Sequence, residues 1–125
     1  MILNRRIFLG ASVAASLAAP MVRAADHGKP RVVIVGGGAG GATAARYIAN
    51  GSKGAIDVTL VEPTRTYYTC FFSNLYIGGF RELNSIGHSY GGIAKEGVNV
   101  VHDWAIGIDR DAKTVSLAGG AKLNY

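Results

Sequence analysis

A run of glycines between an apolar segment and a helix-forming segment constrains this chain more than any other feature. Residues 31–35 (RVVIV) lead directly into residues 36–41 (GGGAGG), where Gly36, Gly38 and Gly41 occupy the three glycine positions of the G-x-G-x-x-G pattern. The first glycine permits a tight turn out of a strand. The second lets the backbone approach a pyrophosphate that a Cβ would block, and the third lets the next helix pack closely on the sheet.

The segments around these glycines have the patterns of a βαβ unit. The nearly continuous apolar run at residues 31–35 is typical of a parallel strand covered on both faces. Residues 42–49 (ATAARYIA) are good helix formers with apolar side chains at one-face spacing, and Asn50 and Gly51 are expected to end the helix. Residues 56–61 (IDVTLV) predict the second strand. The start of such a helix presents N–H groups and the positive end of its dipole to a pyrophosphate.

An acidic residue stands where the second predicted strand ends. Glu62 lies 21 residues after Gly41, at a position where a carboxylate accepts hydrogen bonds from ribose hydroxyls. The alternative for Glu62 is an exposed strand-end carboxylate, and the alternative for the glycine run is a turn that holds no ligand. Strand, glycine turn, helix, strand and acid in this order predict a dinucleotide-binding unit. FAD and NAD use the same unit, so the spacing leaves both open.

The first 24 residues have the pattern of an export signal. Arg5 and Arg6 are followed by residues 7–19, an apolar stretch of 13 residues, which is shorter than the roughly 20 needed to span a bilayer. Residues 22–24 (VRA) then fit the small-residue cleavage pattern, and the whole predicts a twin-arginine signal peptide cleaved after Ala24. A retained amphipathic helix is the alternative. We expect a periplasmic protein with no membrane span after cleavage, whose mature part is residues 25–125.

Charge and cysteine content argue against several classes of function. Three of the 13 basic residues lie in the leader, so ten basic and eight acidic residues remain, and these are scattered singly. The chain has no basic run interleaved with aromatic residues, which argues against a nucleic-acid partner. The single cysteine, Cys70, excludes an internal disulfide framework and a zinc site of several thiolates, and no metal site is predicted.

The last third of the chain is predicted to be rich in strands. Residues 98–101 have the apolar character of a third parallel strand. Residues 105–108, 114–117 and 122–125 follow as short strands separated by turns. This pattern predicts a β-meander that lies over the sheet.

Three polar residues outside the glycine turn could carry chemistry. His88 could move a proton, but a polar loop residue is the favoured interpretation. His102 and Asp103 could form a general base, but they follow a predicted strand, so a strand exit is favoured.

An aromatic segment, residues 67–74 (YYTCFFSN), contains the single cysteine. A free cysteine is commonly a small buried hydrophobe. This segment, the glycine turn with residues 42–45 (ATAA), and residues 58–63 (VTLVEP) together resemble the flavoprotein subunit of flavocytochrome c sulfide dehydrogenases, among the disulfide-oxidoreductase-like flavoproteins. The match continues at residues 77–79 (IGG), Ile86, His88, Tyr90 and residues 100–103 (VVHD).

The resemblance implies an α/β, Rossmann-like FAD-binding βαβ unit with a β-meander. It also implies that a thioether joins Cys70 to the 8α carbon of the flavin, since the thiolate is the nucleophilic form of cysteine. A packed thiol is the alternative. The implied activity is oxidation of sulfide, with electrons passed through the flavin to a c-type cytochrome subunit. No catalytic residue is predicted, and the predicted cofactor-binding residues are Gly36, Gly38, Ala39, Gly40, Gly41, Glu62, Pro63 and Cys70.

The resembled flavoproteins have two dinucleotide-binding domains, a redox-active cysteine pair and a C-terminal interface domain. The 125 residues hold only the first of these parts, so we expect residues 25–125 to be the N-terminal part of a truncated FAD-binding domain, inactive alone. Two other interpretations stay open. One is an enzyme with non-covalent FAD, linked to NAD(P) or to a quinone, and the other is a non-catalytic remnant.

Overall fold

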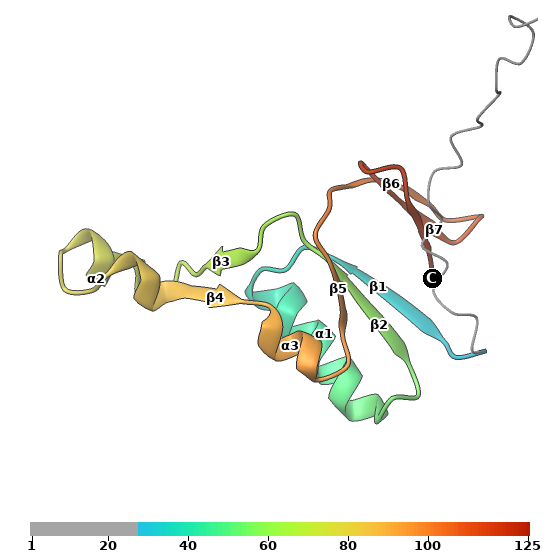
Figure 1. Ribbon diagram of the computed structural model, residues 1–125, viewed down its shortest axis with the longest axis horizontal. Helices are drawn as coiled ribbons and strands as arrows, with labels where there is room; N and C mark the ends of the chain where they lie inside the picture. The colour runs from blue at the N-terminus through green and yellow to red at the C-terminus, as the bar shows by residue number, and fades with distance from the viewer. Residues whose placement is uncertain (1–27) are drawn as a thin grey trace, which may run out of the picture.

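A parallel sheet of three strands forms the centre of the molecule (Figure 1). The computed structural model describes residues 28–125, so the predicted leader, residues 1–24, lies outside the described residues. The strands are β1 (Arg31–Val35), β2 (Asp57–Val61) and β5 (Asn99–Val101), in the order β1-β2-β5. All three predicted parallel strands are therefore present, and the middle one is the second in sequence.

Two helices lie on one face of this sheet (Figure 1). The long helix α1 (Ala39–Ser52) connects β1 to β2, and the short helix α3 (Gly91–Lys95) precedes β5. The small side chains of Ala45 and Ala49 are buried against Val58 and Leu60 of β2, as the one-face spacing predicts. Within residues 28–125, no helix combines the length and apolar character needed to cross a bilayer.

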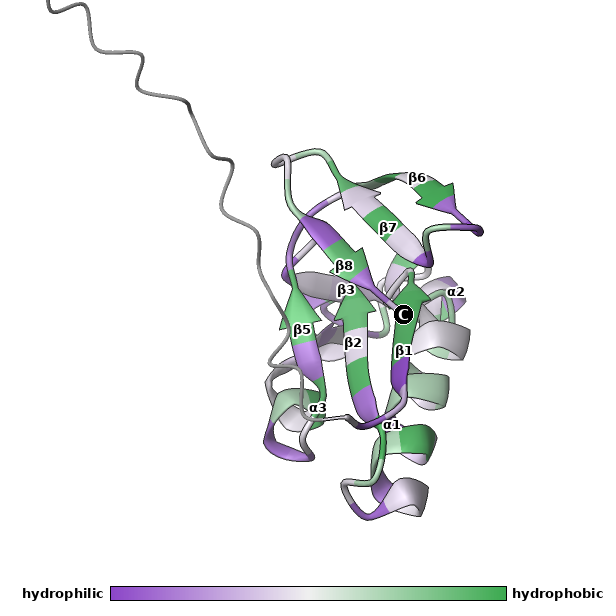
Figure 2. Cartoon of the chain, turned by 90° about the vertical axis from the view of Figure 1, so that its right-hand side faces the viewer, coloured by the Kyte–Doolittle hydropathy of each residue, from purple (hydrophilic) through white to green (hydrophobic). Residues whose placement is uncertain are grey.

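The β-meander covers the opposite face of the sheet. Its strands are β6 (Ala105–Asp109), β7 (Thr114–Leu117) and β8 (Lys122–Asn124), which pair antiparallel in sequence order. Val61 of β2 packs with buried residues of this meander, whereas the adjacent Leu60 packs with the helices. Figure 2 shows the hydrophobic strands of the sheet with polar residues at their amino ends. Burial on both faces explains why residues 31–35 form a nearly continuous apolar run.

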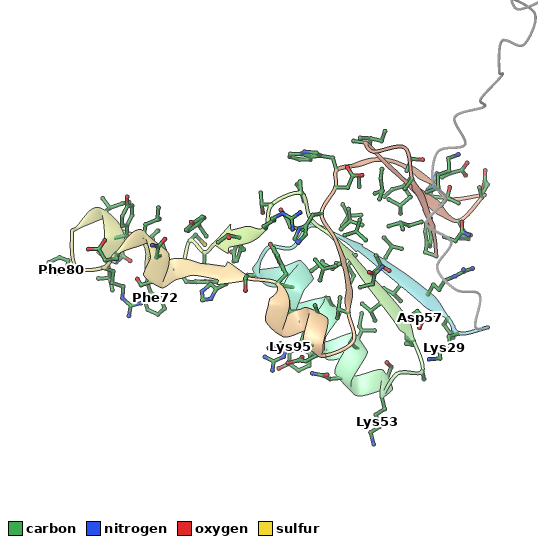
Figure 3. The ribbon with its side chains drawn as sticks, in the orientation of Figure 1. Lys29, Lys53, Asp57, Phe72, Phe80 and Lys95 are labelled. Carbon is green, nitrogen blue, oxygen red and sulfur yellow. The ribbon has the colours of Figure 1, made fainter. Side chains whose placement is uncertain are left out.

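Residues 66–89 form an arm that extends away from the sheet (Figure 1). Its base is an antiparallel pair, β3 (Thr66–Tyr68) and β4 (Gly87–Ser89). Its tip holds the short helix α2 (Ser73–Ile77) and the 3₁₀ helix η1 (Leu83–Ile86). Figure 3 labels Phe72 and Phe80 on this arm.

Two expectations about local structure are wrong. Asn50 and Gly51 do not end α1, which continues to Ser52. The helix stops where the backbone turns left-handed at Lys53 (φ 50°) and Gly54 (φ 82°), because a positive φ cannot continue a right-handed helix. His88 does not lie in a loop, since it is the central residue of β4 and pairs with Tyr67.

The first turn of α1 packs directly on the end of β1. A Cβ at Gly41 would overlap the carbonyl oxygen of Gly36 and lie 3.4 Å from Cγ2 of Ile34. The third glycine of the pattern is therefore required for close packing of helix on strand, as the sequence predicts.

We expect Gly41→Ala to destabilise the fold, because the added methyl group must push the helix away from the Gly36 carbonyl. Overpacking of this kind costs about 1–3 kcal/mol. The matched control is Gly51→Ala, also in α1, where a Cβ would meet no atom within 4 Å and helix propensity favours alanine. Thermal unfolding followed by circular dichroism should show a lower Tm for Gly41→Ala only. Equal Tm values for the two variants would show that the close contact is not needed.

Candidate dinucleotide-binding site

The glycine turn leaves β1 at the carboxyl end of the sheet, where nucleotide sites of such folds lie (Figure 1). Gly36 has a positive φ of 98°, which a residue with a side chain rarely adopts, and its N–H donates to the carbonyl oxygen of Val61 at 2.9 Å. The turn is therefore tied to the end of β2. This geometry agrees with the role that the sequence predicts for the first glycine.

The second predicted glycine borders open space. A Cβ at Gly38 would meet only the ring of Tyr67, at 4.0 Å. Gly38 is also the N-cap of α1, and none of the described residues caps this end with a side-chain hydrogen bond. The first intrahelical bond runs from the Ala42 N–H to the Gly38 carbonyl, so the N–H groups of Ala39, Gly40 and Gly41 precede the helical ladder. Such a helix start is suited to bind an anion.

Glu62 turns its carboxylate toward the glycine turn. One oxygen accepts a hydrogen bond from the Gly37 N–H at 2.8 Å, and the other accepts from the N–H of Thr64 at 3.0 Å and from its hydroxyl at 2.6 Å. A carboxylate has about four acceptor positions, so capacity for another donor remains on the oxygen that faces Gly37. Glu62 therefore holds the loop as well as standing at the strand end. An unattached surface carboxylate does not fit this arrangement.

Partial burial raises the pKa of Glu62, but the hydrogen bonds outweigh that effect. The bond from the Thr64 hydroxyl, the backbone bonds from Gly37 and Thr64, and the nearby His102 together lower the pKa below its ordinary value of 4.5. The carboxylate is consequently ionised at neutral pH, which is the form that accepts hydrogen bonds from ribose hydroxyls.

A second contact on the glycine turn was not predicted from the sequence. The hydroxyl of Tyr90 donates to the carbonyl oxygen of Gly37 at 2.9 Å, and the tyrosine is buried. Burial raises the pKa of Tyr90, and the charge of Glu62 raises it further, so this hydroxyl stays a donor. A Cβ at Gly37 would lie 2.6 Å from the Tyr90 oxygen and 2.8 Å from Cγ of Glu62. A side chain at Gly37, which lies outside the glycine pattern, would therefore have to displace Tyr90 or Glu62.

His102 and Asp103 lie directly after β5, at the strand exit that the sequence predicts. Nδ1 of His102 lies 3.0 Å from the backbone oxygen of Glu62, directly after β5. The carboxylate of Asp103 accepts from the N–H groups of Trp104 and Gly119, at 2.7 and 3.0 Å. Both side chains thus bind backbone groups of neighbouring loops. Among residues 28–125, no three His, Cys, Asp or Glu side chains are placed to hold a metal ion.

A cavity of about 400 Å³ lies between the start of α1 and the arm. Ala39 contributes from α1, Tyr67 and His88 from the β3–β4 pair, and Phe71 and Phe72 from the turn after β3. Its volume falls within the usual range for small-molecule sites, and aromatic side chains are common walls of such sites. All lining residues except Ala39 belong to the arm, which the sequence indicates only through its aromatic residues.

Cys70 is exposed and lies between two residues that line this cavity, Thr69 and Phe71. Its turn is held by hydrogen bonds from the N–H and hydroxyl of Ser73 to the Cys70 carbonyl, at 3.2 and 2.8 Å. The Thr69 hydroxyl also accepts from the Phe71 N–H at 3.2 Å. The packed-thiol alternative does not fit an exposed side chain. Pro63, the remaining predicted residue, is partly buried beside Glu62.

Comparison with known protein sequences gives two findings. The sequence pattern of the family described as pyridine nucleotide-disulphide oxidoreductase matches residues 30–125. The sulfide dehydrogenase [flavocytochrome c] flavoprotein chain of Chlorobaculum thiosulfatiphilum is 53% identical over 47 residues, which are 38% of this chain and 96% of that sequence. The resemblance predicted from the residues is therefore confirmed.

Comparison with solved structures agrees with this match. The sulfide:quinone oxidoreductase of Aquifex aeolicus is similar with a TM-score of 0.68 and 26% identity, covering 77% of this chain and 22% of that one. The water-forming NADH oxidase of Lactobacillus brevis, at 24% identity and a TM-score of 0.70, shares the fold over 78% of this chain and 23% of its own. The predicted α/β dinucleotide-binding fold is confirmed, and the chain spans less than a quarter of the length of these proteins.

The pKa of Glu62 predicts how stability depends on pH. Because the folded-state pKa lies below 4.5, the ionised carboxylate stabilises the fold above that pH, and this stabilisation is lost as the pH falls through the lowered pKa. We expect Glu62→Gln to reduce the free energy of unfolding at pH 7 by about 1–2 kcal/mol, since charged acceptors are lost to Gly37 and Thr64. The difference from wild type should shrink steadily below the ordinary pKa.

Urea unfolding at a series of pH values measures this difference. The control is Glu82→Gln, whose carboxylate is exposed, and it should behave as wild type at every pH. A Glu62→Gln deficit that stays the same at acid pH would mean that the carboxylate charge does not support the loop.

Proposed function

Because this chain belongs to the pyridine nucleotide-disulphide oxidoreductase family, we propose that residues 31–62 bind the adenosine diphosphate part of FAD in a flavoprotein oxidoreductase. One observation carries the proposal. Gly38 borders open space beside the start of α1, and the Glu62 carboxylate stands next to it with acceptor capacity left. A pyrophosphate and a ribose require these groups side by side.

Each group has a distinct task in this proposal. The N–H groups of Ala39, Gly40 and Gly41 at the start of α1 would donate to the pyrophosphate, and the missing Cβ of Gly38 would let it approach. Glu62 would accept hydrogen bonds from ribose hydroxyls while it holds Gly37. Pro63 follows Glu62 two residues after the end of β2, and it has no N–H with which to continue the strand ladder.

The aromatic cavity favours a flavin over a nicotinamide as the group beyond the pyrophosphate. It begins at Ala39, the first residue of α1, and continues along Tyr67 and Phe71 to the cysteine turn. When bound, the flavin would supply an electron-accepting ring, which no amino-acid side chain can replace. The chain's own residues bind the ring, orient it and cover part of it from water.

Covalent attachment through Cys70 is the finer part of the proposal. The thiol is exposed and lies in the turn between Thr69 and Phe71, which line the cavity, and this position beside the cavity supports the proposal. The bond would replace the S–H bond of the thiol and one C–H bond of the flavin 8-methyl group by an S–C bond. The two electrons released would pass to the flavin ring itself, and the two protons would pass to the ring and to solvent.

For the complete protein we propose oxidation of sulfide and electron transfer to a c-type cytochrome partner after export to the periplasm. The name of the Chlorobaculum relative supports the donor and the partner, and the arginine pair at Arg5 and Arg6 supports the export route. A protein with non-covalent flavin, linked to a quinone or to NAD(P), is the alternative, and the name of the Aquifex sulfide:quinone oxidoreductase supports the quinone link.

We expect Gly38→Ala to weaken nucleotide binding without weakening the fold. The new methyl group would occupy the space proposed for the pyrophosphate, yet it would meet only the Tyr67 ring at 4.0 Å. Isothermal titration calorimetry of the flavin-free full chain with ADP should show a Kd at least about tenfold higher, equivalent to about 1.4 kcal/mol. Gly51→Ala is the matched control and should bind as wild type. Unchanged affinity in Gly38→Ala would refute the assignment of the pyrophosphate site.

Acid precipitation tests how the flavin is held. The full chain, purified from cells that supply FAD, should carry its yellow colour into the precipitate, and mass spectrometry should find flavin on the Cys70 peptide. Cys70→Ser should release all flavin into the supernatant while its circular dichroism spectrum stays that of the wild type.

Two other outcomes would overturn parts of the proposal. Complete release of flavin from the wild-type protein would contradict the thioether and leave the non-covalent enzyme. Absence of flavin absorbance from both proteins, with no thermal shift on adding FAD, would contradict flavin binding and favour a non-catalytic remnant.

A further inference from the structure

Both peptide groups that flank the Cα of Gly37 are held by side chains from distant elements. The Gly37 N–H donates to Glu62, 25 residues away at the end of β2. The Gly37 carbonyl accepts from the hydroxyl of Tyr90, 53 residues away and directly before α3. The two hydrogen bonds are 2.8 and 2.9 Å long, and the bond to Tyr90 is buried.

Tyr90 is itself firmly placed. Only 5% of its surface is exposed, and its ring belongs to the core cluster with Leu60 and Val98. Its ring also lies against that of His102, with the centroids 5.9 Å apart, and His102 in turn lies 3.0 Å from the backbone oxygen of Glu62. The hydroxyl therefore reaches the glycine turn from a ring that is packed in the core.

The glycine turn needs such support because of its composition. Five of its six residues are glycines, and a glycine loses more conformational freedom on ordering than any other residue. A ligand that had to order this turn would bind more weakly, because the lost conformational entropy of the glycines opposes binding. Hydrogen bonds on both sides of Gly37 restrict the turn before a ligand arrives.

We propose that Tyr90 is a positioning residue that holds the glycine turn in its nucleotide-binding conformation in the absence of nucleotide. The inference rests on the proposed function, because it assumes that this turn receives a pyrophosphate. It assigns a role to a residue that lies outside the βαβ unit. The missing Cβ of Gly37 belongs to the same device, since any side chain there would displace the Tyr90 hydroxyl.

Tyr90 also connects the turn to the aromatic cavity. It follows β4 directly, and His88 of that strand lines the cavity. Residues 88–90 therefore both line the cavity and support the glycine turn. The two ends of a bound nucleotide would thus contact parts of the protein that this segment joins.

Tyr90→Phe tests the proposal, because it keeps the ring in the core and removes only the hydroxyl. In the flavin-free full chain we expect an ADP affinity about tenfold weaker by calorimetry, since the Gly37 carbonyl loses its buried donor. We also expect faster hydrogen exchange at the Gly37 amide, which is hydrogen-bonded to Glu62, without nucleotide. The matched control is Tyr47→Phe, whose side chain on α1 is 74% exposed, and it should change neither quantity.

The outcomes separate this inference from the proposed function. If the wild type binds ADP and Tyr90→Phe binds equally well with equal exchange, the positioning role is wrong and the proposed function stands. A lower Tm without a change in affinity or exchange would likewise reduce Tyr90 to a packing residue. If the wild type does not bind ADP, the proposed function fails, while the exchange rates still decide whether Tyr90 orders the turn. Should Tyr90→Phe not fold, a Gly37 amide that exchanges freely in nucleotide-free wild type would overturn the inference.

Discussion

The first turn of α1 lies against the carbonyl oxygen of Gly36, and this contact is possible only because Gly41 has no Cβ. The contact brings the N–H groups at the start of the helix down to the ends of the strands. Glu62, at the end of the neighbouring strand, then borders the same space. A helix displaced by the width of a methyl group would no longer present its donors beside that carboxylate, so the whole candidate site depends on this one approach.

The sheet gives the site a rigid base because it is buried on both faces. Leu60 packs toward the helices and Val61 toward the meander, so β2 cannot shift toward either side without opening a core. The hydrogen-bond ladder also continues one step beyond the strands, from Gly36 to Val61 and from Glu62 to Val101. Gly36 and Glu62 therefore lie in loops but keep the hydrogen bonds of strand residues. A sheet can position loop residues for binding in this way.

Local patterns predicted the parts of the site that are close in sequence. The three glycines, the strand before them and Glu62 lie within one βαβ unit, where spacing along the chain determines spacing in the fold. The end of α1 was misplaced because Asn50 and Gly51 tolerate helical geometry, and the positive φ comes only at Lys53. The arm was not predicted because β3 and β4 are only three residues long and pair across about 20 residues, as Tyr67 does with His88, so they show no periodicity in the sequence.

The sequence by itself determined that a strand, a glycine turn and a helix come together, because only glycine satisfies the positive φ at Gly36 and the close contact at Gly41. It also determined which residues are available to meet a pyrophosphate and a ribose. Only the tertiary structure decided that Tyr90 supports Gly37 and that the arm adds an aromatic cavity beside α1. The reason is that these contacts join segments separated by tens of residues, and their geometry is set by how the core packs rather than by local backbone preference.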